Sequence, residues 1–118
     1  MSTLSQGAAI CASDVLIEGG TGVRFNVQLA DVGEAPAFVV RQGGKVFAYL
    51  NQCAHIAVEL DWLPGQFFDD QGLYLVCATH GAMYEADTGF CVGGPCAGKS
   101  LTALAVEERD GHVYLKAD

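Results

Sequence analysis

The stretch LYLVCATHG, residues 73–81, joins a short apolar run to a cysteine and a histidine that follow it directly. The run Leu73–Val76 comes after the turn-forming residues 69–72, and this pattern predicts a strand that ends where Cys77 begins. Cys77 and His80 therefore lie on a loop that leaves the predicted strand. Loops on a rigid β scaffold are where function usually sits, so the stretch indicates a functional site.

A second pair, Cys53 and His55, follows the predicted strand Val46–Leu50 in the same way. With Cys77 and His80 it makes a four-ligand set of two thiolates and two imidazoles, which suits a soft or borderline metal. Zinc fingers usually pair cysteine with cysteine, whereas each loop here supplies one residue of each kind. Ligand chemistry alone leaves zinc and an iron–sulfur cluster open, and so does the alternative of buried apolar cysteines with ordinary loop histidines.

Outward from these two pairs, the chain has the pattern of short strands joined by turns. The predicted strands are 23–29, 38–41, 46–50, 73–76, 104–106 and 112–115. A glycine pair stands between 38–41 and 46–50, and Asp-Gly stands between 104–106 and 112–115, as in β-hairpins. A helix is possible only near 54–60. The pattern predicts one all-β domain over residues 1–118, an antiparallel sandwich or barrel, with its function in the loop-rich segment Leu63–Gly98.

Composition limits the class of protein. The 118 residues are 51% hydrophobic and 17% charged, which fits one ordered domain and excludes a disordered chain. The net charge of −8 argues against nucleic acid or an anionic membrane as partner. Neither an export signal nor a long apolar stretch is present, so we expect a soluble, cytoplasmic protein.

The two Cys–His pairs resemble the two cluster-binding boxes of Rieske-type [2Fe–2S] proteins. The residues after the second box agree with that family. Tyr84–Gly89 stands where the family has an aromatic residue, an acidic residue and a Thr-Gly turn, and Gly93–Pro95 resembles the loop that covers the cluster. The resemblance extends from about Ala35 to Leu115.

This resemblance implies one [2Fe–2S] cluster, with both cysteines on one iron and both histidines on the other. The implied ligands are Cys53, His55, Cys77 and His80, and the implied neighbours of the cluster are Tyr84, Gly81 and Pro95. It also implies a fold: a Rieske-like antiparallel sandwich or barrel with a small, loop-built cluster-binding lobe.

The implied function is that of a soluble, low-potential Rieske ferredoxin. Such a protein carries single electrons from a reductase to a terminal oxygenase or another redox enzyme, and we expect it to be a monomer. Two alternatives remain: an accessory or regulatory Rieske subunit of a redox complex, and a zinc-stabilised β binding domain.

The sequence does not indicate an enzyme. Rieske-type oxygenases add a large domain with a mononuclear iron held by two histidines and a carboxylate. Only His112 remains once His55 and His80 are assigned, and no Gly-x-Ser-x-Gly or Gly-x-Gly-x-x-Gly motif is present. We therefore expect an electron-transfer protein, which could be one component of a multicomponent oxygenase.

Departures from the family pattern predict a low reduction potential. Val58 and Thr79 stand where respiratory Rieske proteins have a loop disulfide, and Ala82 stands where they have a serine donor to the cluster. Tyr84 stands where they have a tyrosine donor to a cysteine ligand, although packing alone also explains it. With fewer donors and an acidic chain, we expect a potential below roughly +75 mV, in the lower half of the Rieske range.

The remaining cysteines and histidine receive structural interpretations. We expect Cys91 and Cys96, which flank Gly93–Pro95, to be free thiols in a reducing cytoplasm, with a disulfide as the alternative. Cys11 is expected to be a structural or surface thiol, and His112 a surface residue.

The aromatic residues Trp62, Phe67 and Phe68 are expected to pack inside, although an exposed docking patch is the alternative. Asp69–Asp70 is interpreted as a turn signal and not as a catalytic pair. The spacer between the two boxes is longer than in small Rieske ferredoxins, and the extra length is placed at Asp61–Gly65.

Overall fold

The computed structural model describes residues 3–4, 9–29, 33–52, 60–61, 65–69, 71–77, 81–94 and 98–116. Its strands in chain order are β1 (Thr3–Leu4), β2 (Ala9–Ala12), β3 (Val23–Leu29), β4 (Gly33–Gln42), β5 (Lys45–Leu50), β6 (Tyr74–Val76), β7 (Met83–Glu85), β8 (Cys91–Gly93), β9 (Ala103–Leu104), β10 (Val106–Arg109) and β11 (His112–Leu115). One turn of 3-10 helix, η1 (Ser13–Val15), follows β2. The described residues contain no α-helix, and no helix among them has the length and apolarity that crossing a membrane requires.

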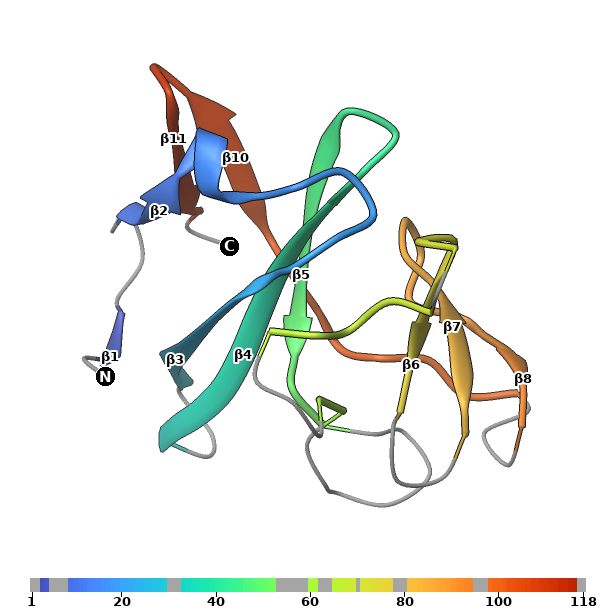
Figure 1. Ribbon diagram of the computed structural model, residues 1–118. Helices are drawn as coiled ribbons and strands as arrows, with labels where there is room; N and C mark the ends of the chain where they lie inside the picture. Colours follow the sequence, from blue (N-terminus) through green and yellow to red (C-terminus); the bar gives the residue numbers. More distant parts are fainter. Residues whose placement is uncertain are drawn as a thin grey trace.

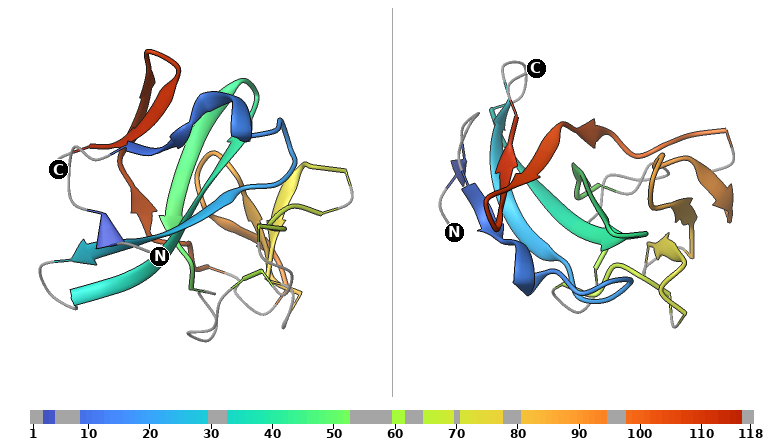
Figure 2. Two further views of the ribbon diagram at one scale, coloured as in Figure 1. Left: turned by 60° about the vertical axis from the view of Figure 1, so that its left-hand side comes forward. Right: turned by 90° about the horizontal axis from the view of Figure 1, so that it is seen from above.

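The strands form three sheets, with the orders β1-β3-β4-β5-β9, β10-β11-β2 and β6-β7-β8. All strand pairs are antiparallel except β1 with β3. Figure 1 shows the first two sheets together, with β6, β7 and β8 set apart at the right, and the view from above in Figure 2 keeps that separation. We call the first two sheets the base, and the third sheet with the described part of residues 60–101 the lobe.

Strand β4 explains how the base and the lobe are joined. Its residues Ala37, Phe38, Val39 and Val40 are all buried, so water covers neither face of the strand here. Successive side chains of a strand point to opposite faces. Ala37 and Val39 therefore belong to the base core, and Phe38 and Val40 belong to the lobe core.

The two cores differ in composition. The base core consists of Leu16, Phe25, Val27, Ala35, Ala37, Val39, Ala48, Leu50, Val113 and Leu115. The lobe core consists of Phe38, Val40, Tyr49, Leu60, Phe67, Leu75, Cys77, Ala82, Tyr84, Ala86, Cys91 and Leu101. Aliphatic side chains dominate the base core, whereas aromatic and sulfur-containing side chains are concentrated in the lobe core.

Two aromatic side chains fasten the lobe to the base sheet. The Tyr49 hydroxyl donates to the Ala86 carbonyl at 2.6 Å, and burial, together with the charges of Asp87 and Glu85, raises the pKa of this phenol. Phe67 stacks on Phe38 with 4.0 Å between ring centroids and is fully buried. The expectation that Phe67 packs inside is therefore confirmed.

The described residues of the segment 65–72 border the lobe sheet. Phe67 accepts a hydrogen bond from the Val76 backbone at 2.8 Å, and Phe68 forms an isolated bridge with Leu75. Phe68 is half-buried against the lobe core. The Asp69 carboxylate caps a turn by accepting from the Leu73 N–H at 2.9 Å, which confirms the turn signal. Trp62 and Asp70 lie outside the described residues.

A loop of the base also holds the far end of the lobe. Gln42, at the end of β4, donates through Nε2 to the carbonyls of Gly72 at 3.1 Å and Leu73 at 2.7 Å. Gly19 and Gly72 touch backbone to backbone: a Cβ added at Gly72 would lie 2.7 Å from the Gly19 oxygen. Only glycine permits so close an approach.

Candidate metal centre

Cys77 is the one predicted ligand that the structure describes. It follows β6 directly, its side chain is fully buried in the lobe core, and it is not disulfide-bonded. Cys53, His55 and His80 lie outside the described residues. Strands β5 and β6, which precede the two predicted ligand loops, both end toward the lower edge of Figure 1. A shared end for these two strands is what a site built from both loops requires.

The second predicted ligand loop is closed at its root by backbone hydrogen bonds. The Cys77 N–H donates to the Ala82 carbonyl at 2.8 Å, and the Gly81 N–H donates to the Cys77 carbonyl at 2.8 Å. Gly81 has φ +74°, which L side chains rarely adopt. The described atoms leave open space where a Cβ would stand, so the backbone conformation is the reason for this glycine.

The chain after β8 packs against the same root. Gly94 has φ +84°, and a Cβ there would lie 2.9 Å from both the Gly81 oxygen and the Ala82 Cα. The described start of the predicted covering loop thus touches the second ligand loop. Pro95 lies outside the described residues, so its predicted place over the cluster stays a prediction.

Tyr84 and Ala82 lie in the core of the lobe. Tyr84 is fully buried on β7, opposite Leu75 of β6, and it shares the lobe core with Cys77. Ala82 is also fully buried, and its methyl side chain has no donor to offer. The hydrogen bond from Tyr84 to a cysteine ligand stays a prediction.

The base contributes a polar group at the root of the first predicted ligand loop. Asn51 is fully buried directly after β5, and its Oδ1 accepts from the Leu60 N–H at 2.8 Å, across the segment that carries Cys53 and His55. Asp61 joins the same network. Sequence reasoning missed both residues, since an asparagine before a box and an aspartate after it resemble ordinary loop residues. Their position on either side of the first box was the one available signal.

One cysteine expectation is wrong. Cys91 is disulfide-bonded, not a free thiol. The other two described cysteines, Cys11 and Cys77, are not in disulfides. The partner of Cys91 therefore lies outside the described residues, and Cys96 is one of the cysteines there. Cys91 is buried in the lobe core, where burial shields a sulfur from reductants more than an exposed loop would.

The two other residues that were interpreted structurally agree with their predictions. Cys11 is a half-buried thiol on β2, and burial raises its pKa, an effect that nearby Arg41 partly offsets. His112 is exposed at the start of β11.

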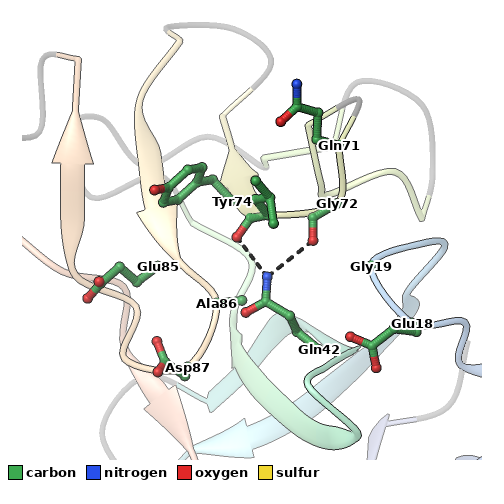
Figure 3. Close-up of a pocket in the computed structure, with 10 residues that line it drawn as sticks. Glu18, Gly19, Gln42, Gln71, Gly72, Tyr74, Glu85, Ala86 and Asp87 are labelled. Atoms are coloured by element: carbon green, nitrogen blue, oxygen red, sulfur yellow. Dashed lines mark hydrogen bonds between the residues drawn. The ribbon is translucent and has the colours of Figure 1, made fainter.

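A polar hollow of about 540 Å³ lies at the opposite end of β6 from Cys77 (Figure 3). Gln42 separates Glu18 on one side from Glu85 and Asp87 on the other, and none of the residues lining the hollow is a cysteine or histidine. Glu18 already accepts from the N–H groups of Gly43 and Gly44, and Glu85 accepts from Thr88. The hollow therefore has the chemistry of a solvated acidic surface and not of a metal centre. The described residues contain no group of three metal-ligating side chains.

The fold and the described part of the site define an all-β domain whose small lobe presents a buried cysteine at the root of a glycine-closed loop. Residues 9–108 match the Rieske [2Fe-2S] domain, and the chain belongs to that family. The fold prediction, an all-β Rieske-like arrangement with a small lobe, is confirmed. A buried thiol is also the donor that an iron–sulfur cluster takes, so the described part of the site fits this family's cofactor.

Solved structures of ferredoxins share the fold over nearly their whole length. The ferredoxin of carbazole 1,9a-dioxygenase from Nocardioides aromaticivorans IC177 is 24% identical, with a TM-score of 0.72, and the match covers 96% of this chain and 99% of that one. The Sphingomonas yanoikuyae B1 ferredoxin is 22% identical, with a TM-score of 0.71, covering 96% and 100%.

A third solved structure contains two redox components. It is a complex of reduced oxygenase and oxidized ferredoxin in carbazole 1,9a-dioxygenase, and the matched chain is 26% identical, with a TM-score of 0.69 and coverage of 92% and 91%. No curated protein matches this sequence.

Proposed function

We propose that this protein is a soluble, cytoplasmic one-electron carrier that acts as a single domain over residues 1–118. It holds one [2Fe–2S] cluster and passes electrons from a reductase to a terminal oxygenase or a similar redox enzyme. The observation that carries the proposal is Cys77, a buried thiol at the end of β6 in a chain whose residues 9–108 match the Rieske domain.

The proposed ligands are Cys53 and Cys77 on one iron and His55 and His80 on the other. When bound, the cluster supplies one-electron redox chemistry at a potential of about −150 to +300 mV. The chain keeps Cys77 away from water in the lobe core and closes its loop through Gly81. A loop fixed at its root moves little when the charge at the site changes, which lowers the reorganisation that each electron transfer requires.

The partner class is supported by the comparison structures. The ferredoxins that share this fold include components of carbazole dioxygenase, and one matched chain comes from a complex of oxygenase and ferredoxin. The net charge of −8 favours partners with a basic docking face. We expect a monomer that binds its redox partners in turn.

Metal analysis of paired variants tests the cofactor. The wild-type protein should contain about two irons and two acid-labile sulfides per chain, with a rhombic electron paramagnetic resonance signal when reduced. Cys77→Ala should lose the cluster, whereas Cys11→Ala, which changes a thiol on β2, should keep it. One zinc per chain in a colourless wild-type protein would overturn the assignment.

Reconstituted turnover tests the carrier role. With a Rieske-ferredoxin reductase and a terminal oxygenase, product formation should depend on this protein and should stop when Cys77→Ala replaces it. A wild-type protein that is reduced by its reductase but supports no turnover with any oxygenase would favour a regulatory subunit.

The potential tests the proposed role of Tyr84. We expect a value below roughly +75 mV for the wild-type protein, and a lower value still for Tyr84→Phe, because a hydrogen bond to a ligand sulfur stabilises the reduced state. Protein-film voltammetry of both proteins measures the difference. A wild-type value near +300 mV would contradict the low-potential assignment.

A further inference from the structure

Three polar side chains form one network where the first predicted ligand loop leaves and rejoins the described chain, and two of the three are buried. Asn51 follows β5 and is fully buried. Asp61 lies beyond the loop, and its side chain is also fully buried. Arg24, on β3 of the base sheet, is 32% exposed. Polar groups removed from water in this way destabilise a fold unless every one of them is bonded, so their partners are informative.

Hydrogen bonds of Asn51 close the loop. Its Oδ1 accepts from the Leu60 N–H at 2.8 Å, and its Nδ2 donates to Asp61 Oδ1 at 3.0 Å. Its own N–H donates to the Pro36 carbonyl of β4 at 2.8 Å. The two chain positions that bracket residues 53–59 are thus tied to each other and to the base sheet.

Asp61 connects the hydrogen bonds of Asn51 to the positive charge of Arg24. Its Oδ2 accepts from the Gly65 N–H at 2.9 Å and lies 3.3 Å from Arg24 Nε. Asn51 Nδ2 donates to the other oxygen, Oδ1. All three of these partners of Asp61 are donors, and a carboxylate can only accept. The guanidinium offsets the buried negative charge, and the stem of Arg24 lets its head remain partly in water.

We propose that Asn51, Asp61 and Arg24 form a neck clamp that positions the first ligand loop, and so controls both how firmly the protein retains its cluster and the potential at which the cluster is reduced. The inference rests on the proposed function, because it takes Cys53 and His55 as ligands. Cys53 stands two residues after Asn51, so any movement of the neck reaches this ligand through one intervening residue. When the clamp holds the two ends of the loop, the loop conformation in which Cys53 and His55 can bind the cluster stays populated, and the cluster is lost less readily.

The charges of the clamp predict opposite effects on the potential. Asp61→Asn keeps the shape of the side chain but removes a buried negative charge, so the reduced state becomes easier to form and the potential rises. Arg24→Gln removes the positive charge and lowers the potential. Loosening of the loop alone would move both variants in the same direction, so the opposite signs distinguish a positioned charge pair from a merely structural contact.

Three measurements on the holoprotein test the clamp. Iron release to a chelator should be about tenfold faster or more in Asn51→Ala, Asp61→Asn and Arg24→Gln, because each variant leaves a buried partner unbonded. Arg24→Lys should recover part of the wild-type retention. Voltammetry should show the potential of Asp61→Asn above, and that of Arg24→Gln below, the wild-type value. Amide exchange at Leu60 and Gly65 should be faster in Asp61→Asn.

Arg41→Gln in the base is the matched control. Arg41 also pairs with a carboxylate, Glu108, but it lies among base strands and serves no ligand loop. This variant should lower the free energy of unfolding while leaving iron release under native conditions and the potential unchanged. Should Asn51→Ala fail to fold, the isosteric Asp61→Asn carries the test.

Two results would overturn the clamp: wild-type iron release in Asp61→Asn and Arg24→Gln, or potentials that shift in the same direction. A wild-type protein without iron and sulfide would instead overturn the proposed function. Amide exchange at Leu60 and Gly65 would then still show whether the network closes the neck.

Discussion

The base and the lobe reach order by different physical means. Strands β3 and β4 of the base run over seven and ten residues. Apolar side chains alternate along β3 into the base core, and those of β4 point into the base core on one face and the lobe core on the other. The lobe strands β6, β7 and β8 have three residues each, too few to bury a face of their own. Single positions hold the lobe instead: stacked aromatics, side chain–backbone hydrogen bonds and glycines.

Glycines with positive φ occur in both regions and differ in what surrounds them. Those of the lobe are Gly65, Gly72, Gly81, Gly89, Gly94 and Gly98. A Cβ would overlap neighbouring atoms at Gly65, Gly72, Gly89 and Gly94. Among the described atoms, Gly81 and Gly98 of the lobe have open space, as Gly43 and Gly44 of the base hairpin do. A side chain at Gly72, Gly89 or Gly94 therefore meets both backbone strain and steric overlap, whereas one at Gly43 or Gly44 meets backbone strain alone.

The largest effect is expected from Phe67→Ala. Phe67 is fully buried and stacks on Phe38, so its removal leaves a cavity between the base and the lobe. Truncation of a buried phenylalanine lowers the free energy of unfolding by about 3–5 kcal/mol. The variant should lose iron and amide protection in β6 and β7, while β3 and β4 keep their protection in hydrogen exchange. Equal loss of protection in both regions would show that they unfold as one unit.

A smaller effect is expected from Gly89→Ala. Gly89 has φ +75°, and a Cβ there would lie 2.7 Å from Cε1 of the buried Tyr49 ring. Backbone strain and overpacking together should lower the free energy of unfolding by about 2–4 kcal/mol.

Gly43→Ala is its control in the base. Gly43 has φ +64° with no described atom within 4 Å of an added Cβ, so only backbone strain of about 1–2 kcal/mol remains. Urea unfolding of both variants measures the difference. Equal values would mean that the Tyr49 ring moves aside and that the lobe is less tightly constrained than the comparison implies.

The strands that could be predicted from the sequence are mostly the long ones of the base, and most of those that could not are short. Alternation located β3 with its observed bounds, because one of its faces is apolar and the other is polar. The turn signal Asp110-Gly111 located β11 with its observed bounds. β4 was predicted as 38–41 and begins at Gly33, since small residues and Pro36 hide its pattern. β1, β2, β7 and β8 were missed, because strands of two to four residues carry almost no periodicity. The predicted strand 104–106 is interrupted at Ala105, where β9 ends and β10 begins.

The site divides in the same manner. The Cys–His boxes could be recognised because few other chemistries require that residue set. Asn51 and Asp61 could not, because Asn51 bonds to Asp61, and Asp61 pairs with Arg24, which is far away in sequence on β3. Contacts between a loop and a distant strand leave no local pattern. The predicted helix near 54–60 lies outside the described residues except for Leu60.

The smallest effect is expected from Glu108→Gln in the base. Hydrogen bonds from Arg41 hold the pKa of Glu108 below its ordinary value of 4.5. At pH values between the folded-state and unfolded-state pKa of Glu108, the unfolded protein binds more protons than the folded protein. The Arg41–Glu108 pair therefore contributes stability above pH 4.5 that disappears as the pH falls through the folded-state pKa.

Urea unfolding at two pH values tests this contribution. Glu108→Gln should lower the free energy of unfolding by about 0.5–1 kcal/mol at pH 7, and the difference should vanish near pH 2. Glu107→Gln, whose partner Arg109 is 52% exposed, is the control and should change little. A difference that persists unchanged at low pH would show that Glu108 acts through packing and not through its charge.

The chain passes from the base to the lobe and back again at two neighbouring points, which makes it feasible to move the lobe into another protein. The Leu50 N–H donates to the Thr102 carbonyl at 2.9 Å, so residues 51–101 leave and re-enter the base at neighbouring points of paired strands. Such a segment is a cassette: it could be exchanged for a short turn, or moved into another hairpin of the same spacing. The exchange would expose Phe38 and Val40 to water. A base without residues 51–101 would therefore need polar side chains at these two positions to avoid aggregation.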